Sequence, residues 1–128
     1  MLPEVFLEVA KEWAANNSES EGHVRSSISR AYYAAFHSCR DTVEGLEIPQ
    51  QSHLPSHKRI IEALRTSGDR DLSKLSKALK DLKAMREAAD YDIEHKVPAQ
   101  NKTVSIRKAE RIIDECAQKM PSSHQSDA

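Results

Sequence analysis

The sequence predicts an all-α protein, folded as an up-and-down helical bundle of four to five helices. Three observations lead to this prediction. Ala, Leu, Glu, Lys, Arg and Ser dominate the composition, which holds only 3 glycines and 5% aromatic residues. Apolar residues recur at steps of three and four, as the buried face of a helix requires. The segments between these patterns are short, and short connections favour antiparallel neighbours in a bundle.

The first two helices are expected over residues 3–16 and 20–46. Pro3 suits a first helical position, because the N–H that proline lacks would have no helical partner there. Phe6 and Trp13 recur at helical spacing along the first segment. The second segment has a longer apolar stripe, made of Val24, Ile28, Ala31 or Tyr32, Ala35, Cys39, Val43 and Leu46.

Three further helices are expected over residues 57–67, 72–91 and 102–119. Ser56 is a good N-cap for the first of them. Pro98 prevents the second from continuing smoothly, because the residue before a proline avoids helical dihedrals. That second helix has the most regular apolar seam of the chain, formed by Leu72, Leu75, Leu79, Leu82 and Ala89.

The chain is predicted to form one domain over residues 1–120, followed by a disordered tail over residues 121–128. No apolar run approaches the roughly 20 residues that a membrane span requires. The first residues lack the charged and apolar regions of a signal peptide. Cys39 and Cys116 fall on predicted helices and are interpreted as reduced, packed thiols. A cytoplasmic protein is therefore expected.

The net charge of −1 hides an uneven distribution of charge. Residues 57–86 carry nine basic and four acidic side chains, net +5, whereas residues 1–56 are net −4 and residues 87–128 are net −2. The basic segment can face a polyanion. Alternatively, its lysines only keep a helix surface hydrated. Each step of three residues rotates the side chain by about 300° around the helix axis, so these lysines form no single stripe. The lysines with this spacing are Lys74, Lys77, Lys80 and Lys83.

Two groups of polar residues are candidates for a site between helices. Arg30, Tyr33 and His37 lie at offsets of three and seven, so they share one face of a helix. Arginine binds phosphate and histidine moves protons near neutral pH, although the three side chains can also serve packing alone. Arg86 and Asp90 lie four residues apart at the margin of the apolar seam. They form either a structural ion pair or an anion-binding site.

Other residues near these groups carry weaker signals. Tyr91 stands at the end of a predicted helix, where backbone carbonyls need donors. On a continuous helix His95 would face away from Arg86, since nine residues amount to about half a turn net. His53 and His57 have the spacing of a helical metal pair, but a proline lies between them and no third ligand is near in sequence. No metal and no cofactor are therefore expected.

Three segments resemble signature elements of the HEPN family, the higher eukaryote and prokaryote nucleotide-binding domains. Residues 29–37, Ser-Arg-Ala-Tyr-Tyr-Ala-Ala-Phe-His, resemble its second-helix signature. Residues 56–58, Ser-His-Lys, resemble its Thr/Ser-His-Lys element, and residues 86–91, Arg-Glu-Ala-Ala-Asp-Tyr, its Arg-x-x-Ala-Asp-Tyr element. The resemblance covers roughly residues 3–119 and implies an up-and-down helical bundle that usually forms a homodimer.

The resemblance also implies a range of functions. Many members of the family are metal-independent ribonucleases of toxin–antitoxin, defence or CRISPR-related systems. This implies an RNA- or nucleotide-binding protein of a toxin–antitoxin or defence system, with an antitoxin as partner and endoribonuclease activity as one version. Other members act beside a nucleotidyltransferase, which gives the alternative: a non-catalytic dimeric partner module for a nucleotidyltransferase or another protein.

The sequence departs from the ribonuclease members, which use Arg-x(4–6)-His near the start of a late helix. No histidine follows Arg86 at that distance, and the Arg30-x(6)-His37 match lies in the second helix instead. Cleavage and binding alone therefore both stay open. With the resemblance in view, Arg86, His37 and His95 are the candidate catalytic residues. The candidate ligand-binding residues are Arg30, Tyr33, Arg86, Asp90 and Tyr91.

Overall fold

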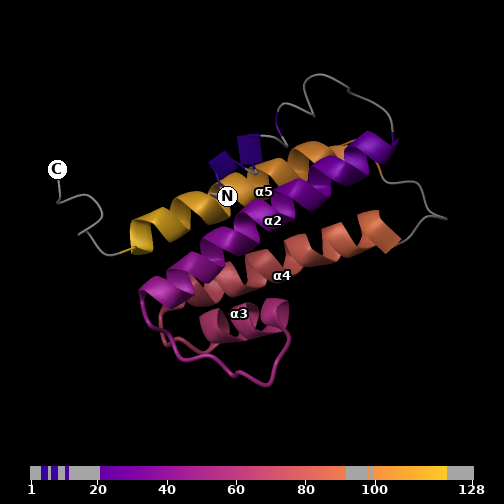
Figure 1. Ribbon diagram of the computed structural model, residues 1–128. Coiled ribbons are helices and arrows are strands. Elements are labelled where there is room, and N and C mark those ends of the chain that lie inside the picture. The colour runs from indigo at the N-terminus through magenta and orange to yellow at the C-terminus, as the bar shows by residue number, and fades with distance from the viewer. Residues whose placement is uncertain are drawn as a thin grey trace.

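The computed structural model describes residues 4, 5, 7, 8, 11, 21–91, 98 and 100–120. Its helices are α2 (Glu21–Gly45), α3 (Ser56–Arg65), α4 (Arg70–Tyr91) and α5 (Gln100–Lys119) (Figure 1). The described part of the chain contains no strand, so the predicted all-α class is confirmed. Within the same residues, no helix has both the length and the apolar character needed to cross a bilayer. The predicted tail, residues 121–128, lies outside the described residues.

The helix predicted over residues 3–16 is described at five positions, all of them helical. Leu7 is 7% exposed and belongs to the main core. Lys11 Nζ forms an ion pair with Glu110 Oε2 of α5 at 2.8 Å. This contact places the N-terminal segment beside α5.

α2 packs on both α4 and α5, but in opposite directions. Arg25, near its start, donates a hydrogen bond to the carbonyl of Ala89 near the end of α4, so these two helices are antiparallel. Gly45, at its end, lies against the Met120 side chain just past α5, so α2 and α5 run parallel (Figure 1). The expectation of mostly antiparallel neighbours therefore fails for this pair. The reason is that the chain runs along α4 in the opposite direction to α2 and then reverses again before α5.

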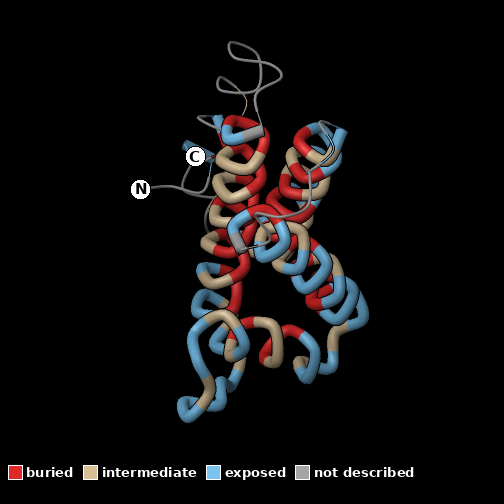
Figure 2. Tube along the Cα trace, turned by 90° about the vertical axis from the view of Figure 1, so that its right-hand side faces the viewer, coloured by how far each residue is buried: buried red, intermediate tan, exposed pale blue. Residues whose placement is uncertain are grey.

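The core is built from one face of each helix, which confirms the steps of three and four read from the sequence. The buried residues form a continuous band along the inside of the helices (Figure 2). The main core includes Tyr32, Ala35, Leu64, Leu79 and Ile112, each at most 1% exposed. A smaller cluster, formed by Val24, Ile28 and Ala89, closes the end of the bundle where α2 begins.

The two cysteines are free and buried, as predicted. The Sγ atoms of Cys39 and Cys116 lie 3.8 Å apart across the interface of α2 and α5. This contact and the burial of the site raise the pKa of the Cys39 thiol, so it stays protonated. Both residues act here as small apolar side chains of the core.

The starts of α3 and α4 differ from the sequence prediction. α3 begins at Ser56 itself, and its N-cap is Pro55, whose carbonyl accepts the Arg59 N–H at 2.8 Å. The expected side-chain cap by Ser56 is therefore wrong, because helical dihedrals begin one residue earlier. At α4 a cap that the sequence reading missed is present: Asp69 Oδ1 accepts the backbone N–H of Leu72 at 3.1 Å. This cap lets α4 begin before residue 72.

Replacing Leu79 by Ala is expected to lower the free energy of unfolding by about 2–5 kcal/mol, because the truncation leaves a cavity in the main core. Val104, which is 41% exposed on α5, provides the matched control. Val104→Ala should change stability by less than about 0.5 kcal/mol. Urea denaturation of both variants measures the difference, and equal losses would contradict the assigned core.

Candidate functional site

Aromatic and charged side chains meet where α2, α3 and α4 come together. We call this group the Arg86 cluster; it comprises Tyr32, Tyr33, Phe36, His57, Arg86 and Asp90. Tyr32, Tyr33 and Phe36 share one side of α2, because offsets of three and four return to the same face of a helix. The His57 ring of α3 stacks on Phe36 with ring centroids 4.3 Å apart.

Arg86 is held against this aromatic surface. Its guanidinium carbon lies 5.5 Å from the centroid of the Tyr32 ring and 5.3 Å from that of Tyr33, within the range of cation–π attraction. Its Nε donates to Asp90 Oδ2 at 3.0 Å. The side chain of Arg86 is 12% exposed and that of Asp90 is 28% exposed. The guanidinium therefore lies at the margin of the bundle, oriented by a carboxylate and two phenol rings.

Tyr32 and His57 form a short hydrogen bond that determines the tautomer of the histidine. The Tyr32 hydroxyl and His57 Nδ1 are 2.6 Å apart, and the tyrosine is fully buried. Burial raises the pKa of Tyr32 far above its ordinary range, so the phenol keeps its proton and needs an acceptor. Nδ1 therefore accepts that proton in a hydrogen bond. A neutral His57 then carries its own hydrogen on Nε2 and presents a donor there.

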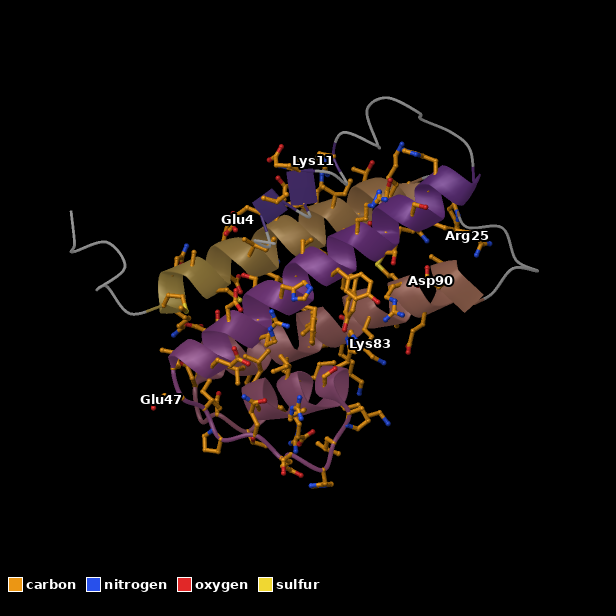
Figure 3. The ribbon with its side chains drawn as sticks, viewed as in Figure 1. Glu4, Lys11, Arg25, Glu47, Lys83 and Asp90 are labelled. Carbon is orange, nitrogen blue, oxygen red and sulfur yellow. The ribbon has the colours of Figure 1, made fainter. Side chains whose placement is uncertain are left out.

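The surroundings of His57 keep its ring neutral near pH 7. Burial lowers the pKa of His57 below its ordinary value of 6.5, and the positive charges of Arg86 and Lys83 lower it further. The negative charge of Glu87 opposes these effects. Lys83 Nζ and Glu87 Oε2 form an ion pair at 2.8 Å on α4. Lys83 and Asp90 lie on the same side of α4 (Figure 3).

The structure brings some of the predicted site residues together. Tyr33 is half-buried beside Arg86, and His37 stacks on Tyr33 with ring centroids 6.4 Å apart. Burial, followed by the charge of Arg40, lowers the pKa of His37. Arg30 is half-buried on α2, one turn before Tyr33.

Two predicted site residues cannot be placed in the same way. Tyr91 is the last residue of α4, and its side chain lies outside the described part of the chain. His95 lies outside the described residues altogether. Their parts in the site stay predictions.

The three sequence segments that suggested a family converge in this cluster, since residues 29–37, 56–58 and 86–91 supply its members from α2, α3 and α4. A family model described as HEPN domain matches residues 4–120. The chain belongs to the HEPN family. The match supports a nucleotide- or RNA-binding, or ribonuclease-type, module, and HEPN domains often dimerise.

One relative of this HEPN domain is an uncharacterized protein of Methanocaldococcus jannaschii. The two are 30% identical over 105 residues, which cover 70% of this chain and 59% of the relative. The chain therefore spans less than two thirds of the length of that protein. No solved structure matches the chain.

The sequence does not predict His57 and Tyr32 as members of the Arg86 cluster. In the sequence His57 belongs to a metal-pair spacing and to the Ser-His-Lys element, and Tyr32 belongs to the apolar stripe and to the second-helix signature, so neither is marked as a site residue. The available signal was the Ser-His-Lys element of residues 56–58, which opens α3. It placed a histidine at a helix start but did not show which side chain that histidine would meet.

The lowered pKa of His57, caused by burial and by the charges of Arg86 and Lys83, predicts a loss of stability in acid. Because folding lowers the pKa of His57, the unfolded chain takes up a proton first as the pH falls through about 6.5. The free energy of unfolding contributed by His57 is therefore fully present above that pH and lost below it. Melting temperatures at pH 7.5 and 5.5 should differ less in His57→Gln, whose amide oxygen can still accept from Tyr32, than in the wild type.

The matched control for that measurement is His53→Gln, which removes an exposed histidine from the loop before α3. It should retain the wild-type difference between the two melting temperatures. An unchanged pH dependence in His57→Gln would contradict the assignment of His57 as a half-buried, neutral acceptor.

Proposed function

We propose that the Arg86 cluster binds a phosphate group of RNA or of a nucleotide. The observation that supports this most directly is the guanidinium of Arg86, which is oriented by Asp90 and two tyrosine rings and kept partly open to solvent. A planar guanidinium matches the oxygen atoms of a phosphate in a bidentate fashion. Holding it in place before the ligand arrives reduces the entropy lost on binding.

The neighbouring side chains suit the same ligand. In this proposal His57 donates from Nε2 to a phosphate oxygen, because its Nδ1 is engaged by Tyr32. Tyr33, half-buried next to Arg86, offers a ring edge and a hydroxyl to the sugar or base. Arg30 and Tyr91 are further proposed ligand contacts, on the face of α2 and at the end of α4.

Metal-independent ribonuclease activity is the stronger version of the proposal. Cleavage requires a group that takes a proton from the 2′-hydroxyl and one that gives a proton to the leaving oxygen. His57 does not suit the first role, since its outward nitrogen is a donor. His37, whose pKa is lowered so that the ring is neutral near pH 7, is the proton carrier within the described residues, and His95 is a second candidate. Binding alone thus requires fewer assumptions than cleavage.

The biological setting that we propose is a toxin–antitoxin or defence system, with the protein acting as a homodimer in the cytoplasm. The alternative is a non-catalytic partner module for a nucleotidyltransferase, favoured by the missing histidine after Arg86. Light scattering of the purified protein should give twice the monomer mass of 14.4 kDa. A monomer at all concentrations tested would contradict the homodimer.

The binding proposal predicts that Arg86→Ala weakens the affinity for a short labelled single-stranded RNA by roughly 10- to 100-fold, since hydrogen bonds to charged groups contribute about 1.5–3 kcal/mol. Fluorescence anisotropy measures this effect. Arg65→Ala is the matched control, because Arg65 is also paired with an acidic neighbour on its own helix but is exposed. Equal affinities of the two variants would contradict the proposal.

A structural role of Arg86 is separated from binding by Arg86→Lys. This variant keeps the charge but loses the planar fork, so it should bind RNA weakly while melting close to the wild type. The same samples, incubated with RNA in a chelator, test the ribonuclease version. Cleavage by the wild type that is lost in Arg86→Ala supports it, and equal cleavage by both, or none by either, rejects it.

A further inference from the structure

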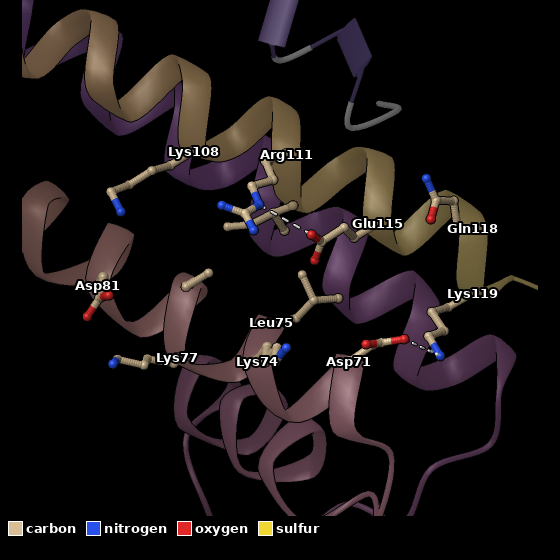
Figure 4. Close-up of a pocket in the computed structure, with 12 residues that line it drawn as sticks. Asp71, Lys74, Leu75, Lys77, Asp81, Lys108, Arg111, Glu115, Gln118 and Lys119 are labelled. Atoms are coloured by element: carbon tan, nitrogen blue, oxygen red, sulfur yellow. Dashed lines mark hydrogen bonds and ion pairs between the residues drawn. The ribbon is translucent and has the colours of Figure 1, made fainter.

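A groove separate from the Arg86 cluster runs between α4 and α5, with a volume of about 400 Å³ (Figure 4). Its floor is apolar, since Leu75 and Ile112 line it and each is only 1% exposed. Its rims are basic: Lys74 and Lys77 come from α4, and Lys108 comes from α5. From the sequence, Lys74 and Lys77 belong to a basic segment that either faces a polyanion or spirals around a helix without a common face.

The acidic side chains of the groove are mostly neutralised by their own partners. Glu115 Oε1 accepts from Arg111 Nε at 3.3 Å, and Asp71 Oδ2 lies 3.1 Å from Lys119 Nζ (Figure 4). Asp81 is the remaining acid among the residues that line the groove. Against it stand three lysines without an ion pair to any described residue: Lys74, Lys77 and Lys108. The groove therefore has a surplus of two positive charges.

The lysine spiral of α4 connects this groove to the Arg86 cluster. Each step of three residues along a helix rises by about 4.5 Å and turns by about 60° in one direction. Lys83 lies about one turn before Arg86 on α4, so the spiral begins beside the cluster. Lys80 and Lys77 follow on the exposed side of α4, and the spiral ends at Lys74, which lines the groove. The spiral is thus a path from one site to the other.

We infer that the α4–α5 groove and this lysine path bind the sugar–phosphate backbone of a single-stranded RNA whose one phosphate occupies the Arg86 cluster. The inference rests on the proposed function and extends it from a single phosphate to a strand of several nucleotides. Within the cluster Arg86 is balanced by Asp90, and beside it Lys83 is balanced by Glu87, so this end of α4 has no surplus of charge. A polyanion needs additional cations, and the groove supplies them.

An RNA strand fits these observations better than an acidic protein segment does. The lysine path leads from the positively charged groove to the Arg86 cluster, which is suited to phosphate. A strand of regularly spaced phosphates can follow a path that winds around one helix. The exposed rim lysines bind such a backbone without reading its sequence.

The test uses the full chain with Lys74, Lys77 and Lys108 all replaced by Gln, and two probes: a labelled single-stranded RNA of about 12 nucleotides and a labelled dinucleotide. The variant should bind the longer RNA at least roughly tenfold more weakly. The slope of log affinity against log salt should fall by about 2, since each lysine removed accounts for about 0.7. Binding of the dinucleotide, which reaches only the Arg86 cluster, should stay unchanged. The matched control removes three positive charges elsewhere: Lys11→Gln, Arg40→Gln and Arg65→Gln.

The outcomes separate this inference from the proposed function. If the wild type binds the long RNA and the groove variant binds it equally well with the same salt slope, the groove inference is overturned and the Arg86 proposal stands. If the wild type binds neither probe, the proposed function is overturned and the inference falls with it. If poly-glutamate binds the wild type but not the groove variant, while RNA binds both equally, the groove serves an acidic protein partner instead. Equal melting temperatures of the variants show that folding is not the cause.

Discussion

A guanidinium that continues an apolar seam is the constraint around which this bundle is organised. Leu72, Leu75, Leu79 and Leu82 line the inner side of α4, and the next position in the same series of steps is Arg86. A charge in such a place is costly to remove from water unless it gains partners of its own. Its partners are the rings of Tyr32 and Tyr33 and the carboxylate of Asp90. Because Arg86 takes the position where another leucine would continue the seam, this end of the hydrophobic core is a polar site.

The hydrogen bond between Tyr32 and His57 extends the same constraint to α3. A phenol that is fully buried must have an acceptor, and the short helix supplies one through a ring that also stacks on Phe36. The position of α3 on the bundle is thus coupled to the protonation of one histidine. The coupling has a chemical consequence, because a histidine that accepts on one nitrogen offers a donor on the other. Such a side chain is suited to holding an anion and poorly suited to removing a proton.

α4 is the element shared by both proposed binding regions. Its inner side carries the Arg86 cluster toward α2 and α3, and its other flank forms the groove toward α5. The lysines at steps of three look scattered on a helical wheel, since they return to no common face. On the folded protein the same scatter becomes a continuous path, because the two regions lie on different flanks of one helix. Lysines that form no stripe on a helical wheel can therefore still form a continuous basic path on the surface of the folded protein.

The sequence alone determined the helices, their buried faces and the family, because each of these follows from patterns local to one helix or one short segment. The pairing of Arg86 with Asp90 was also within its reach, since a separation of four residues fixes their distance on a helix. What meets Arg86 across the bundle was not: Tyr32 and His57 are 25 residues apart, and only the packing of α3 on α2 makes them partners. The parallel course of α2 and α5 was likewise decided by the tertiary structure, as was the groove that Lys74 and Lys108 line from different helices. Contacts between helices depend on how whole faces fit together, and no spacing along the chain encodes that fit.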